Sequence, residues 1–117
     1  MSRKSRGITV TNPRPAVTPV CPSSGSTVLD SSDPDNWTCI YNWSPDVLVG
    51  TFQQWYQVNG TGWILDQSSV NRHSGVEIDN DPHGFADSGD FLEFKAICSD
   101  VGGCGDFETN PQGATLP

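Results

Sequence analysis

The stretch that decides the fold is Trp37-Thr38-Cys39-Ile40-Tyr41-Asn42-Trp43. Large apolar side chains alternate in it with smaller or polar ones, which is the period of a β-strand with one buried face. Proline cannot continue a paired strand, so we expect Pro45 to end it. The buried face should hold the residues at alternate positions, namely Trp37, Cys39, Tyr41 and Trp43.

Two further strands follow from the same alternation. Residues 47–58 predict a strand with Phe52, Gln54 and Tyr56 on one face and Gln53, Trp55 and Gln57 on the other. The turn sequence at 59–62 leads into Trp63-Ile64-Leu65, which predicts a hairpin. Residues 91–98 predict a third strong strand. Its inward face should carry Leu92, Phe94, Ala96 and Cys98.

The composition favours a single all-β domain. Of the 117 residues only 34% are hydrophobic, whereas 12 are glycine and 9 are proline, a mixture typical of short strands and turns. We expect polar loops at 22–36 and 66–75 and an acidic loop at 79–90. A short strand is expected around Val76 and Ile78, and a segment at 106–109 that pairs back.

The strand pattern resembles the fibronectin type III and related immunoglobulin-like family. Trp43-Ser44-Pro45 is similar to the end of that family's second strand, and Phe52 to the aromatic that begins its third. Residues 89–96 are similar to its sixth strand. The resemblance spans about residues 15–110 and implies an antiparallel sandwich of about seven strands, preceded here by an extended N-terminal arm.

Charge divides the chain into an arm and a body. Residues 1–29 contain no acid and carry +4, whereas residues 30–117 carry −12, which gives the net charge of −8. We therefore predict an extended, proline-rich arm at 1–20 and a sandwich domain at 21–117, with short edge strands at 8–10 and 16–20 in the arm. The arm should bind an acidic partner through its cations, Arg3, Lys4, Arg6 and Arg14.

Four cysteines, Cys21, Cys39, Cys98 and Cys104, lack the paired spacing of a zinc site, so disulfides are expected. A Cys39–Cys98 bridge would need a register shift between strands of opposite sheets. Our prediction is Cys21–Cys39, which joins the arm to a strand, and Cys98–Cys104, which closes a hairpin. Four reduced thiols, with Cys39 simply buried, is the alternative.

The acidic loop echoes a calcium-binding loop in its spacing. Asp79, Asp81, Asp87 and Asp90 take loop positions 1, 3, 9 and 12, and glycine takes position 6. His83 at position 5, the internal Pro82 and the absence of a long bidentate glutamate favour a plain solvated loop. No cofactor is therefore expected, with calcium kept as an alternative.

Enzymatic chemistry is not expected. His73 and His83 stand in polar loops outside any metal-binding motif, and no nucleophile elbow or phosphate-binding loop occurs. Trp55 and Trp63 have two interpretations: they either cover the core or face outward, where they would stack on sugars or anchor a partner.

These features predict a non-enzymatic structural protein that binds a larger assembly through its arm, namely a decoration or cement protein of a bacteriophage capsid. Its partner would be a protein lattice such as a major capsid protein, with neither membrane nor nucleic acid involved. The protein itself would be a homo-oligomer or be present in many copies per assembly. We expect synthesis in the host cytoplasm and residence on the virion surface, because disulfides persist only in oxidising surroundings. The alternative is an extracellular carbohydrate-binding or adhesin module that uses Trp55 or Trp63.

Overall fold

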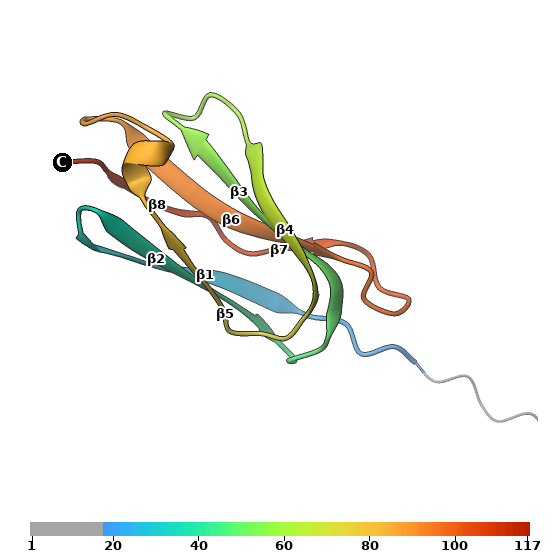
Figure 1. Cartoon of the computed structure of the whole chain (residues 1–117). Helices are drawn as coiled ribbons and strands as arrows, with labels where there is room; N and C mark the ends of the chain where they lie inside the picture. The colour runs from blue at the N-terminus through green and yellow to red at the C-terminus, as the bar shows by residue number, and fades with distance from the viewer. Residues whose placement is uncertain (1–17) are drawn as a thin grey trace, which may run out of the picture.

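The computed structural model describes residues 18–117, and these form a β-sandwich of two antiparallel sheets (Figure 1). The expected arm strand at 8–10 lies outside the described residues, and residues 18–20 have no regular secondary structure. In chain order the elements are β1 (Ser24–Asp33), β2 (Asn36–Ser44), β3 (Val49–Val58), β4 (Ile64–Arg72), β5 (Val76–Asn80), the short 3₁₀ helix η2 (Pro82–Gly84), β6 (Phe91–Ser99), β7 (Phe107–Glu108) and β8 (Gln112–Thr115).

The sheet topology confirms the predicted fold class. One sheet has the order β1-β2-β5, and the other has the order β4-β3-β6-β7 with β8 also paired to β6. Strand β7 pairs with Ile97 and Cys98, and β8 pairs with residues 91–94, so the two are successive pieces of one edge strand. Counted in this way, the described residues form seven strands, divided three against four between the two sheets.

The predicted inward faces form the core. The four alternate residues of β2 are between 0% and 3% exposed, and the four of β6 are fully buried. Phe52 of β3 packs against the rings of Tyr41 and Trp43, with centroid distances of 5.4 and 6.3 Å. The alternating pattern therefore identified the inward side of β2 and β6 correctly, and it separated the two faces of β3, of which the face with Phe52 and Gln54 is the buried one.

Two expected loops are strands instead. Residues 24–33, inside the expected polar loop at 22–36, form β1, and the expected loop at 66–75 is mostly β4. Both strands lie at a sheet edge and bury little: Thr27 is the buried residue of β1, and β4 has none. Because burial creates the apolar alternation, an edge strand with so little of it carries no pattern to read.

A buried polar network joins the two sheets. The amide of Gln54, which is fully buried, accepts a hydrogen bond from the hydroxyl of Tyr41 at 2.5 Å and donates to Asp66 and Asn80 at 2.8 and 2.9 Å. Asn80 in turn donates to the carbonyl of Trp37 at 3.2 Å. The network thus links β2, β3, β4 and β5 inside the sandwich.

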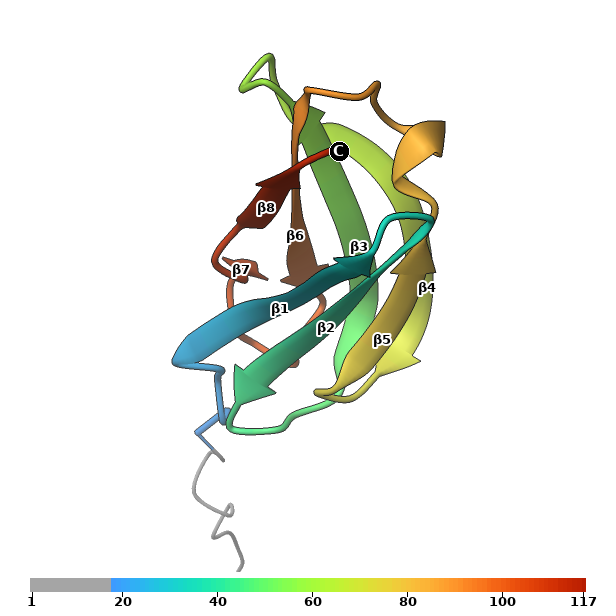
Figure 2. The same cartoon turned by 90° about the vertical axis from the view of Figure 1, so that its left-hand side faces the viewer.

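The sandwich has two distinct ends (Figure 2). The described chain enters at the end where β1 begins, and the C-terminus lies at the opposite end. Five acids lie in the β1–β2 turn and the β5–β6 connection, at the end opposite to chain entry: Asp33, Asp35, Asp81, Asp87 and Asp90. Among residues 18–117, no helix has the length and apolar character needed to cross a membrane.

Candidate attachment end and binding face

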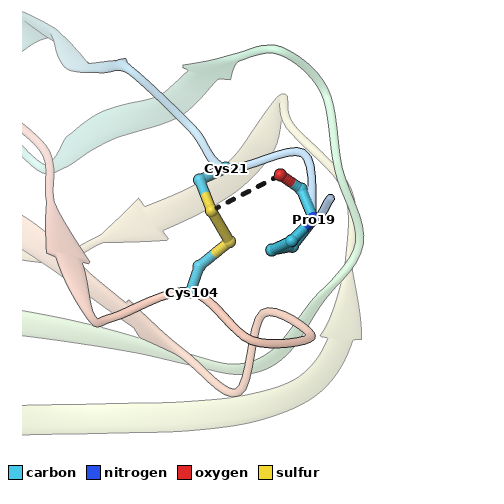
Figure 3. Close-up of a disulfide and its surroundings, with 3 residues drawn as sticks. All are labelled: Pro19, Cys21 and Cys104. Carbon is cyan, nitrogen blue, oxygen red and sulfur yellow. Dashed lines mark hydrogen bonds between the residues drawn. A yellow bond between two sulfur atoms is a disulfide. The ribbon is translucent and has the colours of Figure 1, made fainter. Parts of the chain in front are cut away.

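A disulfide closes the end of the sandwich where the chain enters. Cys21, three residues before β1, is bonded to Cys104 in the β6–β7 loop, with the two Cα atoms 5.7 Å apart (Figure 3). The carbonyl oxygen of Pro19 lies 4.0 Å from the sulfur of Cys21, and the Pro19 ring faces Gly103. The segment that leaves the arm is therefore joined covalently to the second sheet.

The predicted disulfide pairs are both wrong. The observed bond is Cys21–Cys104, while Cys39 and Cys98, also within the described residues, are free. In the β1–β2 register Leu29 stands opposite Cys39, so Cys21 is eight residues away along the strand. That corresponds to about 26 Å of extended chain, far beyond the reach of a disulfide.

Cys98 fails to pair with Cys104 for a different reason. Its side chain points into the core from the middle of the sheet, between Phe52 and Phe107 of the neighbouring strands, whereas Cys104 lies in the loop beyond the strand end. Cys39 is buried in the same core from the opposite sheet. Burial raises the pKa of Cys39 to about 11 and that of Cys98 to about 12, so both stay protonated and unreactive near neutral pH.

The predicted arm cations, Arg3, Lys4, Arg6 and Arg14, lie outside the described residues. The structure does describe the point at which the arm meets the body. Two open hollows of about 340 and 330 Å³ flank the beginning of β1 there, and both are lined by Ser24, Gly25 and Asn110. Asn110 donates its backbone N–H to the carbonyl of Gly25 at 3.4 Å, so β1 crosses close to the β7–β8 link.

The outer face of the larger sheet holds the two tryptophans that the sequence singled out. Trp55 is half-buried on β3, on the side of the strand opposite to the inward residues, and donates from Nε1 to Gln53 at 3.2 Å. Trp63, just before β4, is also half-buried. The structure thus places both rings outside the core, which favours the outward interpretation of the two.

Lys95 contacts two other residues of this face. Its ammonium lies 4.4 Å from the centre of the Trp63 ring and 2.8 Å from a carboxylate oxygen of Glu108, and the side chain is only 12% exposed. At the next outward-facing pair of β3 and β6, the amide of Gln57 donates to Glu93 at 2.8 Å. Hydrogen bonds, an ion pair and a cation–π contact therefore connect the indole rings, amides and carboxylates of this face.

Sequence reasoning missed Lys95 and Glu108 as members of this face. Strand parity places Lys95 on the outward face of β6, since its neighbours Phe94 and Ala96 point inward, and the β3–β6 register then sets it opposite Trp55. Glu108 carries no comparable signal, since it belongs to a two-residue strand that forms only by pairing with β6.

The four aspartates of the acidic loop mostly serve the local backbone. Asp81 accepts from the backbone N–H of His83 and begins η2, and Asp90 accepts from the N–H of Asp87 and the amide of Asn59. Asp79 accepts from the hydroxyl of Thr38. Within residues 18–117 no three metal-binding side chains gather at one point. The calcium site stays a prediction of the sequence.

Neither a protein-family model nor a curated protein matches the chain. Two features of the structure bear on function: the disulfide-closed attachment end and the tryptophan face.

Proposed function

We propose that this protein is a non-enzymatic structural protein that binds a larger protein assembly through its N-terminal arm, as a decoration or cement protein of a bacteriophage capsid. The observation that carries the proposal is the Cys21–Cys104 bond. A load on the arm reaches residue 21 first, and the disulfide passes it to both sheets instead of to β1 alone. We also propose that the sandwich is a fibronectin type III-like domain, because its strand pattern resembles that family.

The charge distribution supports this orientation. The arm carries four cations and no acid, and five acids lie at the far end of the sandwich. An acidic lattice would attract the arm and repel the body, which carries Asp46, Asp100 and Asp106 in loops at the entry end besides the five acids at the far end, so the body would project outward. A disulfide also suits a protein that works on the outside of a particle, where no cytoplasmic reductant keeps thiols reduced.

The test replaces Arg3, Lys4, Arg6 and Arg14 together by glutamine. It measures co-sedimentation of this variant with purified capsids of the bacteriophage that encodes the protein. We expect binding to weaken at least about a hundredfold, since each lost charge contact at an interface is worth about 1 kcal/mol. The unfolding midpoint should not change, because the sandwich formed by residues 18–117 contains none of these four residues.

Arg72→Gln, which removes a cation of the body, is the control and should bind like the unaltered protein. Capsid binding that survives loss of all four arm cations would refute the charge-based attachment. Failure of the unaltered protein to bind capsids would refute the capsid itself as the assembly.

A second candidate function is carbohydrate binding, which the tryptophan face favours. An indole ring offers an apolar surface to the C–H face of a sugar, and neighbouring amides and carboxylates can hydrogen-bond its hydroxyls. Trp55 stands beside Gln53, and Glu93 lies one rung away beside Gln57. This function would place the protein in an extracellular setting, as an adhesin-type module.

A glycan array, run with and without EDTA, tests this candidate. If the face binds sugars, Trp55→Ala should lower the signal at least about tenfold, because an aromatic contact in a binding site is worth about 1–2 kcal/mol. Leu48→Ala, at an exposed apolar residue in the β2–β3 loop, should leave the signal unchanged. Loss of signal in EDTA would indicate that the acidic loop holds calcium, and no signal on any glycan would rule the candidate out.

A further inference from the structure

Strand β4 is unusually exposed for its length. It has nine residues, and among the described strands of five residues or more it is the one with no buried residue. It lies at the end of the larger sheet, where β3 pairs with one side of it and no strand of residues 18–117 pairs with the other. Such an edge presents a row of unpaired backbone donors and acceptors.

Strand β4 combines six polar residues with three exposed apolar ones. Seven large hydrophobic residues of the described chain are notably exposed, and three of them belong to β4: Ile64 at 51%, Leu65 at 43% and Val70 at 65%. Exposed apolar groups grouped on one free edge are typical of a surface that another chain covers.

The usual protection against edge pairing is largely missing from β4. The strand contains neither lysine nor proline, and its two charged residues are engaged within the chain. Asp66 accepts a hydrogen bond from Gln54 at 2.8 Å, and Arg72 donates to Ser69 at 3.1 Å. A bulge at Asp66 interrupts the β3 pairing once and leaves residues 67–72 in regular register.

The other sheet is protected by charge. Its edge strand β5 carries Glu77 and Asp79 as exposed residues, and β1 carries Asp30 and Asp33. Two copies of so acidic a body repel each other across most of their surfaces. Across β4, where Asp66 and Arg72 sum to no net charge, this repulsion is weaker.

We infer that β4 pairs with β4 of a second copy, antiparallel, so that the larger sheets of two copies join into one. The pairing is isologous, as a two-fold axis requires, and the nine-residue strand matches itself in length. The arm of another copy fits less well, because its expected strands at 8–10 and 16–20 are only three and five residues long, and Pro19 inside the second cannot donate to a ladder. The inference goes beyond the proposed attachment and does not depend on the arm.

Sedimentation velocity of the full chain over a concentration series tests the inference, with a pair of matched variants. Val70→Lys places a charge on the free edge, and Val28→Lys places the same charge at a 52% exposed valine on the outer face of the smaller sheet. We expect a reversible dimer whose dissociation constant rises at least about tenfold in Val70→Lys and less than about twofold in Val28→Lys.

Hydrogen exchange provides a readout that does not depend on a variant. The amides of residues 64–72 should exchange more slowly as protein concentration rises, while those of β5 should not change. A protein that stays monomeric up to about 1 mM, or a dimer weakened equally by both lysines, would overturn the inference.

The variant lacking the four arm cations separates this inference from the proposed function. It should dimerise normally while failing to bind capsids. Loss of the dimer in that variant would assign self-association to the arm and refute the β4 pairing.

Discussion

Replacing Gln54 by alanine is expected to lower the free energy of unfolding by about 4 kcal/mol, the largest effect of any single substitution proposed for this protein. Gln54 is the centre of the buried network that joins the two sheets. Its loss leaves the hydroxyl of Tyr41 and the side-chain oxygen of Asn80 without a partner inside the core. Each unsatisfied buried group costs about 1–3 kcal/mol, and the vacated volume adds a cavity term.

The effect depends on burial and not on residue type, so a neighbour on the same strand is the control. Gln53 lies next to Gln54 but points to the outer face, where its amide oxygen accepts from Trp55. Gln53→Ala should therefore change stability by less than about 0.5 kcal/mol.

Tyr41→Phe removes one hydroxyl from the network and should cost about 1–2 kcal/mol. Urea unfolding followed by tryptophan fluorescence would measure all three variants. A loss below about 1 kcal/mol in Gln54→Ala would show that water enters the site and satisfies the remaining groups.

Replacing Cys21 and Cys104 together by serine is expected to lower the free energy of unfolding by about 4 kcal/mol. The bond joins residues separated by 83 positions, and closing a loop of that length is worth about 4.5 kcal/mol in the chain-entropy account. For a domain with a total stability of about 5–15 kcal/mol, such a loss would lower the melting temperature by about 15–25 °C.

Thiol counting checks the pairing independently of stability. Under non-reducing conditions the native protein should react with no equivalents of a thiol reagent at pH 8, because both free cysteines are fully buried and their pKa values are raised to about 11 and 12. After denaturation without reductant it should react with two. Four reactive thiols, or a peptide map that links Cys39 to any other cysteine, would contradict the observed bond.

How well a strand could be predicted from the sequence depended on how much of it is buried. Where a strand lies in the middle of a sheet, as β2, β3 and β6 do, one face is buried and the other is not, so the residues alternate and the inward side can be predicted. The edge strands β1, β4 and β8 bury at most one residue each, which is why β1 and the part of β4 after Leu65 read as polar loops and why β8 was not expected at all. The edge strand β5 buries Val76 and was predicted.

The disulfide shows a second limit. Spacing along the chain suggested short-range bridges, but a bond requires that two Cα atoms come within about 4.4–6.8 Å, and the β1–β2 register and the position of the β6–β7 loop decide which do. Cys21 and Cys104 lie near opposite ends of the described chain and meet only because the two sheets stack. No local pattern contains that information.

The sequence by itself determined the all-β class, the inward faces of β2 and β6 and the division into a basic arm and an acidic body, because these follow from local alternation and from charge counting. Tertiary structure decided which cysteines pair, how Gln54 is satisfied, that Lys95 contacts both Trp63 and Glu108, and that β4 ends the sheet with a free edge. Each of these depends on distances between residues remote in sequence, which only the packing of one sheet on the other and the order of strands within each sheet can set.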